Sequence, residues 1–261
     1  MGRKQKIRIG RRVGAHREML MSRVRRYYGE ERVADGLPEM LDDDLQRQYT
    51  EAAMAIYRQP WATEEELERI NDRLAPHWLS GMHWDDLHGA VLVELACQIA
   101  ASRPKLVLDA GCGVGLDSVF LALQFPDVQF VGTDLSARMI GYAQTRAQRR
   151  QRRVQNARFL VAAHRELPAC FPDTRFDMVV THGSCVYVDA DHLAQHCAAF
   201  AAVLRSGGQW FTEMPFEQPP DHFLGAITAL APQFDLPNGN AIRTLRLHGE
   251  EVCWNAVFRR K

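Results

Sequence analysis

Three glycines alternate with other residues in the segment Gly111-Cys-Gly-Val-Gly115, between a predicted strand at 105–109 and a predicted helix at 117–125. Glycine has no Cβ, so the backbone there adopts positive φ and approaches a ligand closely. A helix that begins just after such a loop leaves N–H groups free for a polar group of the ligand. The loop is therefore a candidate ligand-binding turn.

Two aspartates indicate what this loop binds. Asp109 ends the strand before the loop, and Asp134 ends the next predicted strand, 128–132. A carboxylate at Asp109 repels a pyrophosphate but attracts an ammonium or a sulfonium, and one at Asp134 accepts hydrogen bonds from ribose hydroxyls. Leu116 stands where the dinucleotide fingerprint GxGxxG has its last glycine. The pattern favours a sulfonium nucleoside over a dinucleotide.

The elements that position these residues alternate along residues 101–261. Alternation of apolar strands with helices is typical of a parallel sheet covered on both faces. Two runs near the end, 241–247 and 251–258, predict a closing antiparallel hairpin. The remaining predicted strands are 157–161, 176–180 and 209–214, and the remaining helices run from Ser136 to about 150 and over about 190–204.

Residues 1–100 have a different character, because no clear strand is visible there. Helical patterns cover about 16–28, 39–58, 63–75 and 84–101, and the third begins at Thr63 and Glu66, a capping box. We therefore expect two parts: a helical N-terminal segment, 1–100, and an α/β domain, 101–261.

The composition is that of an ordinary globular protein, with 46% hydrophobic and 25% charged residues and no formal net charge. This balance argues against attraction of the whole surface to nucleic acid or membrane. Two local basic runs, 1–12 and 146–153, are interpreted as a solvated face or tail, with nucleic-acid contact as the alternative.

The chain offers no pattern that predicts export, a membrane span or a metal site. No apolar run spans a bilayer, no secretory signal is visible, and the six cysteines show no CxxC spacing. We therefore expect a cytoplasmic protein with isolated thiols. His192 and His196 share one helix face, which is interpreted as a polar face and not as a pair of metal ligands.

Four segments in the expected order resemble the motifs of class I S-adenosylmethionine-dependent methyltransferases. They are Val107-Leu-Asp-Ala-Gly-Cys-Gly-Val-Gly115, Val131-Gly-Thr-Asp-Leu-Ser136, Phe176-Asp-Met-Val-Val-Thr181 and Leu204-Arg-Ser-Gly-Gly-Gln209. The resemblance implies a doubly wound, mostly parallel seven-stranded sheet with a reversed last strand, and S-adenosylmethionine as cofactor. It also implies a set of cofactor-binding residues: Asp109, Gly111, Cys112, Gly113, Gly115, Asp134, Leu135, Ala163, His164 and Thr181.

The sequence departs from the family at two places. Ala163 stands where many members have an aspartate that binds the adenine amine, so the backbone, His164 or Glu166 must supply that contact. Tyr187 stands where many small-molecule methyltransferases have a histidine after the fourth strand, and His182 lies nearer the strand end. Either residue is a candidate catalytic group that orients or deprotonates an acceptor.

Helices that precede the first strand in this family often cover the cofactor and build the acceptor pocket. The N-terminal segment is rich in aromatic residues, whose faces attract a sulfonium by cation–π interaction, with plain core packing as the alternative. The candidate substrate or lid residues are Tyr27, Tyr28, Trp78, His83 and Trp84, and His88 lies in the same stretch.

The function predicted is methyl transfer to a small-molecule acceptor enclosed by the helical cap. Three alternatives remain open: an RNA or protein methyltransferase that uses the basic runs, an enzyme that cleaves or cyclises S-adenosylmethionine to release methylthioadenosine, and a binder without catalysis. The acceptor atom and the oligomeric state are not defined by the sequence.

Overall fold

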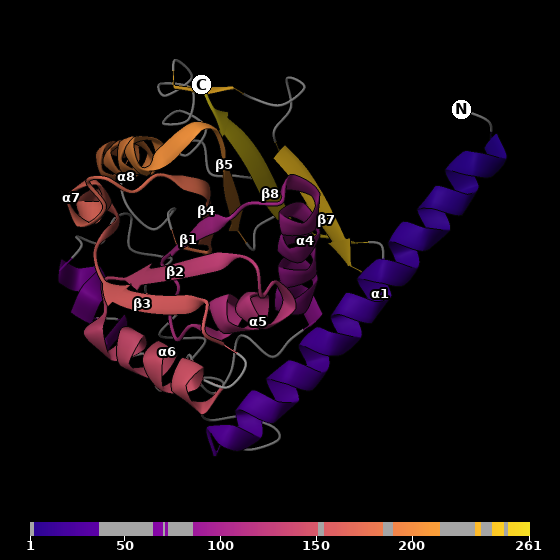
Figure 1. Cartoon of the computed structure of the whole chain (residues 1–261), viewed down its shortest axis with the longest axis horizontal. Coiled ribbons are helices and arrows are strands. Elements are labelled where there is room, and N and C mark those ends of the chain that lie inside the picture. Colours follow the sequence, from indigo (N-terminus) through magenta and orange to yellow (C-terminus); the bar gives the residue numbers. More distant parts are fainter. Residues whose placement is uncertain are drawn as a thin grey trace.

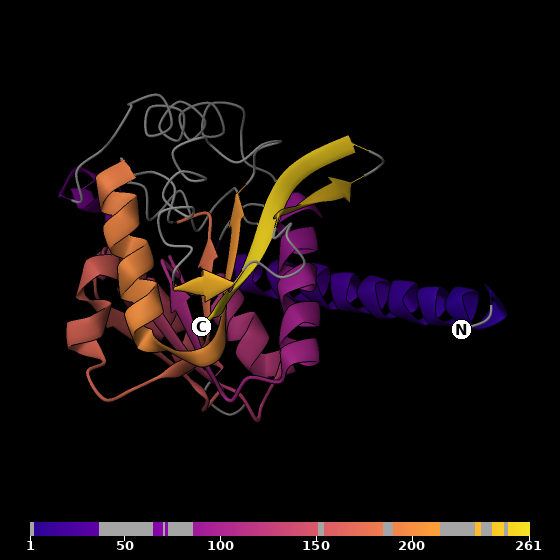
Figure 2. The same cartoon turned by 90° about the horizontal axis from the view of Figure 1, so that it is seen from above.

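The computed structural model describes residues 3–36, 65–69, 71–72, 86–150, 154–184, 190–214, 233–235, 242–247 and 250–261. In this part of the chain a twisted central sheet has helices on both faces (Figures 1 and 2). None of its helices combines the length and the hydropathy needed to span a bilayer.

The sheet has the order β3-β2-β1-β4-β5-β8-β6, with β7 also paired to β8. The first five strands are parallel, whereas β8 is antiparallel to each of its neighbours. Since β6 and β7 pair with different parts of the same edge of β8, the described strands occupy seven positions. The bounds are β1 Leu106–Ala110, β2 Gln129–Asp134, β3 Ala157–Val161, β4 Phe176–His182, β5 Leu204–Met214, β6 Phe234–Asp235, β7 Ile242–Leu247 and β8 Glu250–Arg260.

This topology confirms the doubly wound, mostly parallel fold predicted from the sequence, including its reversed last strand. Several predicted strand ends differ from the structure by one or two residues, and the largest difference is at β5, which begins at Leu204 and not at Gln209. Its register against β4 shifts between Phe176 and Met178, because residues 205–208 form an irregularity within the strand pairing.

Two apolar cores fill the two faces of the sheet. Alternate strand residues point to opposite faces, so Val107, Met178 and Phe211 belong to one core while Leu108, Val179 and Trp210 belong to the other. The first core packs against α1 Arg3–Ala34, α4 Asp86–Ser102, α5 Leu116–Gln124 and α6 Ala137–Arg149. The second packs against α7 Leu167–Cys170, which follows the short 3₁₀ turn His164–Glu166, and against α8 Ala190–Val203.

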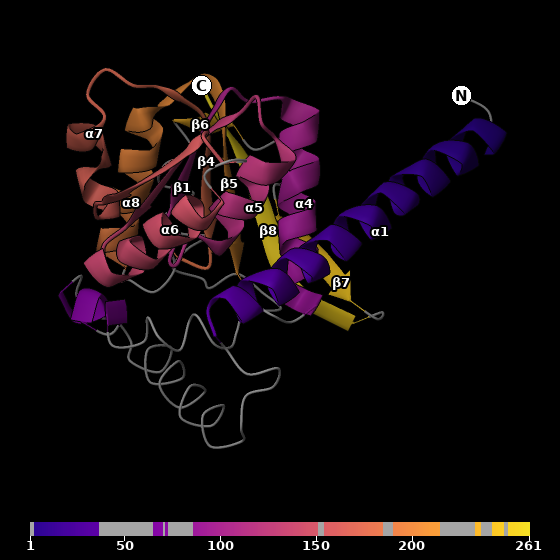
Figure 3. The same cartoon turned by 60° about the horizontal axis from the view of Figure 1, so that its bottom comes forward.

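The N-terminal helix α1 is much longer than the predicted helix 16–28. Its C-terminal half packs beside α4, while its N-terminal half projects away from the body of the protein (Figure 1). The predicted helix 39–58 lies outside the described residues. Parts of the predicted helix 63–75 are described, since residues 65–69 and 71–72 are helical and lie near the start of α6 (Figure 3).

Ion pairs between α6 and the end of α1 correct the expectation of a solvated face for the described part of the basic run, residues 146–150, whereas residues 151–153 lie outside the described part of the chain. Arg146 is 1% exposed and pairs with Glu31 at 2.8 Å and with Asp35 at 2.6 Å. Arg149 pairs with the same two acids, and Arg150 pairs with Glu31. The positive charges of α6 are therefore partnered within the fold by acids that lie far away in the sequence.

Candidate cofactor and active site

The glycine loop lies at the carboxyl ends of β1 and β2. The strand order reverses between β1 and β4, and ligands of open α/β sheets bind at such a switch point. The φ angles of Gly111, Gly113 and Gly115 are 83°, 52° and 71°, so each glycine has the positive φ that its residue type permits. The Gly111 N–H donates to the carbonyl of Thr133 at 2.7 Å, which fixes the loop against the end of β2.

Gly111 has no room for a side chain. A Cβ at this position would lie 2.3 Å from the Cβ of Ser184. The Ser184 hydroxyl donates to the carbonyl of Ala110 at 2.7 Å, which holds the end of β4 against the loop. Both φ and packing therefore require glycine here.

Asp134 is tied to the loop by backbone hydrogen bonds. Its Oδ2 accepts from the Gly113 N–H at 3.0 Å and its Oδ1 accepts from the Ser136 N–H at 2.9 Å. Burial raises the pKa of Asp134 to about 6, although these two bonds lower it. A carboxylate has about four acceptor positions, so capacity remains for a further donor such as a ribose hydroxyl.

Asp109 is a second buried acid on the same pocket. It is 5% exposed and accepts a hydrogen bond from the Ser118 hydroxyl. Burial raises the pKa of Asp109 to about 7, with the bond from Ser118 acting in the opposite direction. A cationic ligand beside this carboxyl favours its ionised form.

These groups face one cavity of about 150 Å³. The glycine loop, Asp109 and Asp134 line one part of it, and His182 lines another. Leu67 and Asn71 of the N-terminal segment also line the cavity. The structure thus places four predicted features, namely the glycine loop, Asp109, Asp134 and His182, around one cavity.

The stretch after β3 is arranged differently from the expectation for adenine. Ala163 lines the cavity, but its N–H donates to Glu166 Oε2 at 3.0 Å, so Glu166 caps the turn and is not among the residues that line the cavity. His164 also lines the cavity, with Nδ1 3.4 Å from His196 Nδ1 and a hydrogen bond to the carbonyl of Ala110. Burial, together with His196, holds the pKa of His164 well below its usual range, so this ring is neutral.

The other candidate cofactor residues have varied surroundings. Cys112 and Leu135 line the cavity. Gly115 precedes α5 and packs against Ala143, where a Cβ would lie 2.6 Å from the side chain. Thr181 is fully buried, accepts a hydrogen bond from Trp210 Nε1 at 3.0 Å and does not line the cavity.

Among the predicted substrate residues, Tyr27 and Tyr28 are buried in the core between α1 and the sheet. The Tyr27 hydroxyl donates to the carbonyl of Leu116 at 3.0 Å, and neither tyrosine lines the cavity. This geometry supports the packing alternative for both tyrosines. Trp78, His83, Trp84 and the candidate catalytic residue Tyr187 lie outside the described residues.

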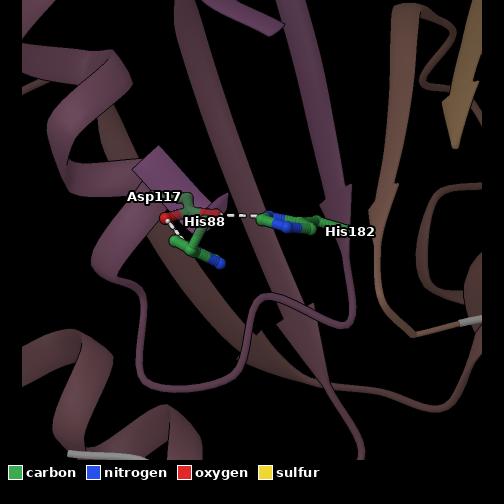
Figure 4. Close-up of side chains that lie close together, drawn as sticks. All are labelled: His88, Asp117 and His182. Atoms are coloured by element: carbon green, nitrogen blue, oxygen red, sulfur yellow. Dashed lines mark hydrogen bonds and ion pairs between the residues drawn. The ribbon is translucent and has the colours of Figure 1, made fainter. Parts of the chain in front are cut away.

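A chain of four polar side chains, which we call the His–Asp cluster, consists of His88, Asp117, His182 and Glu213. Figure 4 shows the first three, which come from α4, α5 and β4. His88 Nε2 lies 2.9 Å from Asp117 Oδ1, and His182 Nδ1 lies 2.6 Å from Asp117 Oδ2. His182 Nε2 forms an ion pair with Glu213 Oε2 at 2.9 Å.

Asp117 and His182 hold opposite charges in this cluster. Burial alone would raise the pKa of Asp117, but His88 and His182 outweigh it and hold this pKa well below the usual range. Burial alone would lower the pKa of His182, but Glu213 and Asp117 outweigh it and raise this pKa well above the usual range.

Sequence reasoning missed Asp117 and Glu213 as members of the site. The available signals were the acid in the first turn after the glycine loop and the acid near the end of strand β5. Their meaning depends on the pairing of His182 with Glu213 in neighbouring strands, which the sequence alone does not define.

Comparison with known proteins agrees with this geometry. Residues 107–208 match a family described as a methyltransferase domain. This match covers less than half of the chain, and it makes residues 107–208 similar to methyltransferase domains, in agreement with the resemblance of the four motifs to class I S-adenosylmethionine-dependent methyltransferases.

Individual relatives share part of the chain. It is 32% identical over 159 residues to a trans-aconitate 2-methyltransferase of Variovorax paradoxus, covering 59% of this chain and 56% of the relative. It is 30% identical to a fatty-acid O-methyltransferase of Mycolicibacterium smegmatis, covering 51% of this chain and 40% of the relative. The chain thus spans about half the length of the curated relatives it matches.

A solved structure shows the same fold. The N-methyltransferase NodS of Bradyrhizobium japonicum superposes with a TM-score of 0.57 at 16% identity, and the match covers 73% of this chain and 98% of NodS.

Proposed function

We propose that the protein transfers the methyl group of S-adenosylmethionine to a small-molecule acceptor. The observation that carries this proposal is the convergence of the glycine loop, Asp109 and Asp134 on one cavity, which His182 also lines. When bound, the cofactor supplies an activated methyl group on a sulfonium.

The residues around the cavity fit this cofactor. Asp134 has free acceptor capacity for the ribose hydroxyls. Gly113 lines the cavity and has open space where a Cβ would lie, so the cofactor can approach the backbone there. Asp109 supplies a carboxyl whose ionised form is favoured by a sulfonium or ammonium. Because a sulfonium is already a good leaving group, the protein mainly has to hold the acceptor in line with the methyl group.

We propose that the acceptor enters beside the N-terminal segment. Leu67 and Asn71 line the cavity, and the next residue, Asp72, accepts a hydrogen bond from the Ser136 hydroxyl at the start of α6. These contacts support the expectation that the N-terminal helices enclose part of the pocket. His182, at the end of β4, is the described candidate for orienting the acceptor, and Tyr187, outside the described residues, remains a candidate from the sequence.

The curated relatives favour an organic acid as the acceptor class. The two named above methylate trans-aconitate and a fatty acid, and both substrates carry carboxyl groups. An oxygen of a carboxylate attacks a methyl sulfonium without first losing a proton. This class therefore makes the smallest demand on general-base catalysis.

The ion pairs of the basic run at 146–150 argue against a nucleic-acid substrate. Arg146, Arg149 and Arg150 were candidate phosphate contacts, but each of them is paired with Glu31. An excess of positive charge on α6 is therefore not available to a phosphate backbone.

The test begins with calorimetric titration of the full chain with S-adenosylmethionine. Asp134→Asn is expected to weaken binding about 10- to 100-fold, because a charge-assisted bond to the ribose is lost. The exposed Asp127, at the far end of β2, provides the matched control Asp127→Asn, which should bind as the unmodified protein does.

Product analysis then separates the reactions. Incubation with a panel of small carboxylic acids should yield S-adenosylhomocysteine together with a methyl ester. Methylthioadenosine as the nucleoside product would show cofactor cleavage instead, and absence of measurable cofactor affinity would refute the proposal as a whole.

A further inference from the structure

We propose that His88, Asp117 and His182 form a binding site for a divalent first-row transition-metal ion. This site rests on the geometry of the His–Asp cluster, three members of which line the same cavity as the glycine loop. The three side chains come from α4, α5 and β4 and turn toward one another (Figure 4).

The spacing of the ligand atoms suits one ion. One nitrogen of each histidine and one oxygen of Asp117 all lie within 4.8 Å of one another. Ligand atoms about 2.1 Å from one metal are about 3 Å apart when they subtend a right angle at it. The two nitrogen–oxygen separations, 2.9 Å for His88 and 2.6 Å for His182, are close to that value.

Glu213 gives His182 the outer partner that metal-bound histidines usually have. Its carboxylate lies 2.9 Å from His182 Nε2 and is 2% exposed. A histidine that binds a metal through one ring nitrogen commonly directs the other ring N–H at a carboxylate, which fixes the tautomer and the ring orientation. With Nε2 facing Glu213, Nδ1 of His182 faces Asp117 and donates its proton to that carboxylate in the metal-free protein. Release of this proton would make Nδ1 the metal ligand.

The charges of the cluster also call for a cation. Two carboxylates, Asp117 and Glu213, are 13% and 2% exposed, and the two imidazole rings are stacked with centroids 4.3 Å apart and an interplanar angle of 16°. Buried carboxylates are paired or coordinate metals. A dication bound by neutral histidines would balance both carboxylates. Because a metal lies in the plane of each imidazole that binds it, and the two rings are nearly parallel here, one ring has to turn about its Cβ–Cγ bond when the ion binds.

The ligand types define the class of ion. Imidazole nitrogen suits zinc, iron, cobalt or nickel better than magnesium or calcium, which prefer oxygen ligands, and the Asp117 carboxylate adds the oxygen ligand that manganese prefers. Three protein ligands leave coordination positions open. Because His88, Asp117 and His182 all line the cavity, those positions face the space where an acceptor would bind. This last step, which assigns the open positions to acceptor oxygens, rests on the proposed function.

The test is metal titration of the full chain after treatment with EDTA and its removal. We expect one equivalent of Zn²⁺, Mn²⁺ or Co²⁺ to bind with a dissociation constant below about 10 µM. Bound Co²⁺ should show visible absorption bands shifted from those of the aqueous ion. His88→Gln and Asp117→Asn should each weaken metal binding at least about 10-fold, and Glu213→Gln should weaken it by about 10-fold through His182.

The matched control is His16→Gln, because His16 is an exposed histidine on α1, away from the cluster. This variant should bind metal as the unmodified protein does. Far-UV circular dichroism checks that each variant is folded. If His88→Gln does not fold, the comparison uses Asp117→Asn, whose side chain has the same shape as that of the aspartate.

Two results would overturn the site: no binding tighter than about 100 µM for all three ions, or equal affinity in the unmodified protein and both ligand variants. Either result would show that protons alone bridge the cluster. Titration with S-adenosylmethionine, with and without metal, is a separate arm. Loss of cofactor binding alone refutes the proposed function, and loss of metal binding alone refutes this site.

Discussion

Replacement of Asp109 by asparagine is expected to stabilise the unliganded protein while it weakens cofactor binding. The carboxyl is buried next to the glycine loop, and burial raises its pKa to about 7. In the unfolded chain the same group has a pKa of about 3.9. The folded state therefore holds the proton more tightly than the unfolded state, and stability falls as the pH rises between these two values.

The size of the effect follows from this difference. Each unit of pKa is worth about 1.4 kcal/mol. Between about pH 5 and pH 8 the folded state loses about 2.5 kcal/mol through Asp109, with little further loss above that range. An asparagine has no such titration, and its amide oxygen still accepts a hydrogen bond from Ser118.

The assay is urea unfolding of the unliganded protein at several pH values across that range. Other groups titrate in both proteins, so the difference in unfolding free energy between Asp109→Asn and the unmodified chain isolates Asp109. This difference should grow by about 2.5 kcal/mol from pH 5 to pH 8, while affinity for S-adenosylmethionine falls about 100-fold at pH 8.

Asp127→Asn again serves as the control, because that carboxyl is exposed. A difference between Asp109→Asn and the unmodified protein that stays constant across the pH range would show that Asp109 is ionised in the unliganded state, and the reasoning from burial would be refuted. Cofactor affinity equal to that of the unmodified chain would refute the role in binding.

Three further changes test other parts of the structure. Gly111→Val should abolish calorimetric binding of the cofactor, since its Cβ would lie 2.3 Å from that of Ser184; binding within a few-fold of the unmodified chain would contradict the packing argument. Glu31→Gln should lower the unfolding free energy by about 3 kcal/mol, because Arg146 is then a buried charge with a weaker partner, and a loss typical of an exposed ion pair would contradict it. Ser136→Ala removes the helix cap of α6 and should cost about 1 kcal/mol in the same assay; an unchanged denaturation midpoint would count against the cap.

The parts of the fold that could be predicted from the sequence are those with local signals. The apolar strands, the glycine loop and the acids at the strand ends each show in a short window, and the loop prediction brought Asp109 and Asp134 to the same cavity. The order of the motifs along the chain then defined the sheet, because parallel strands with helical crossovers have few possible arrangements.

The parts that could not be predicted depend on distant pairings. Arg146 is one member of a basic run that contains no acid, and only the packing of α1 on α6 reveals Glu31 as its partner. Likewise, His182 meets Glu213 only because β4 and β5 pair in a register that includes an irregularity. No short window of sequence contains these relationships, so a basic run was interpreted as solvated and the His–Asp cluster was missed.

The pairing of Arg146 with Glu31 also bears on how the family domain can be handled as a unit. The segment that matches the methyltransferase family, 107–208, contains Arg146 but neither of its acidic partners. A protein cut to that segment would leave the Arg146 guanidinium without Glu31 and Asp35, and it would expose Arg146 together with the side of α5 that Tyr27 packs against. A chimaera or a truncated enzyme that uses this cofactor site therefore has to include α1. The smallest segment that keeps the fold is longer than the segment that matches the methyltransferase family.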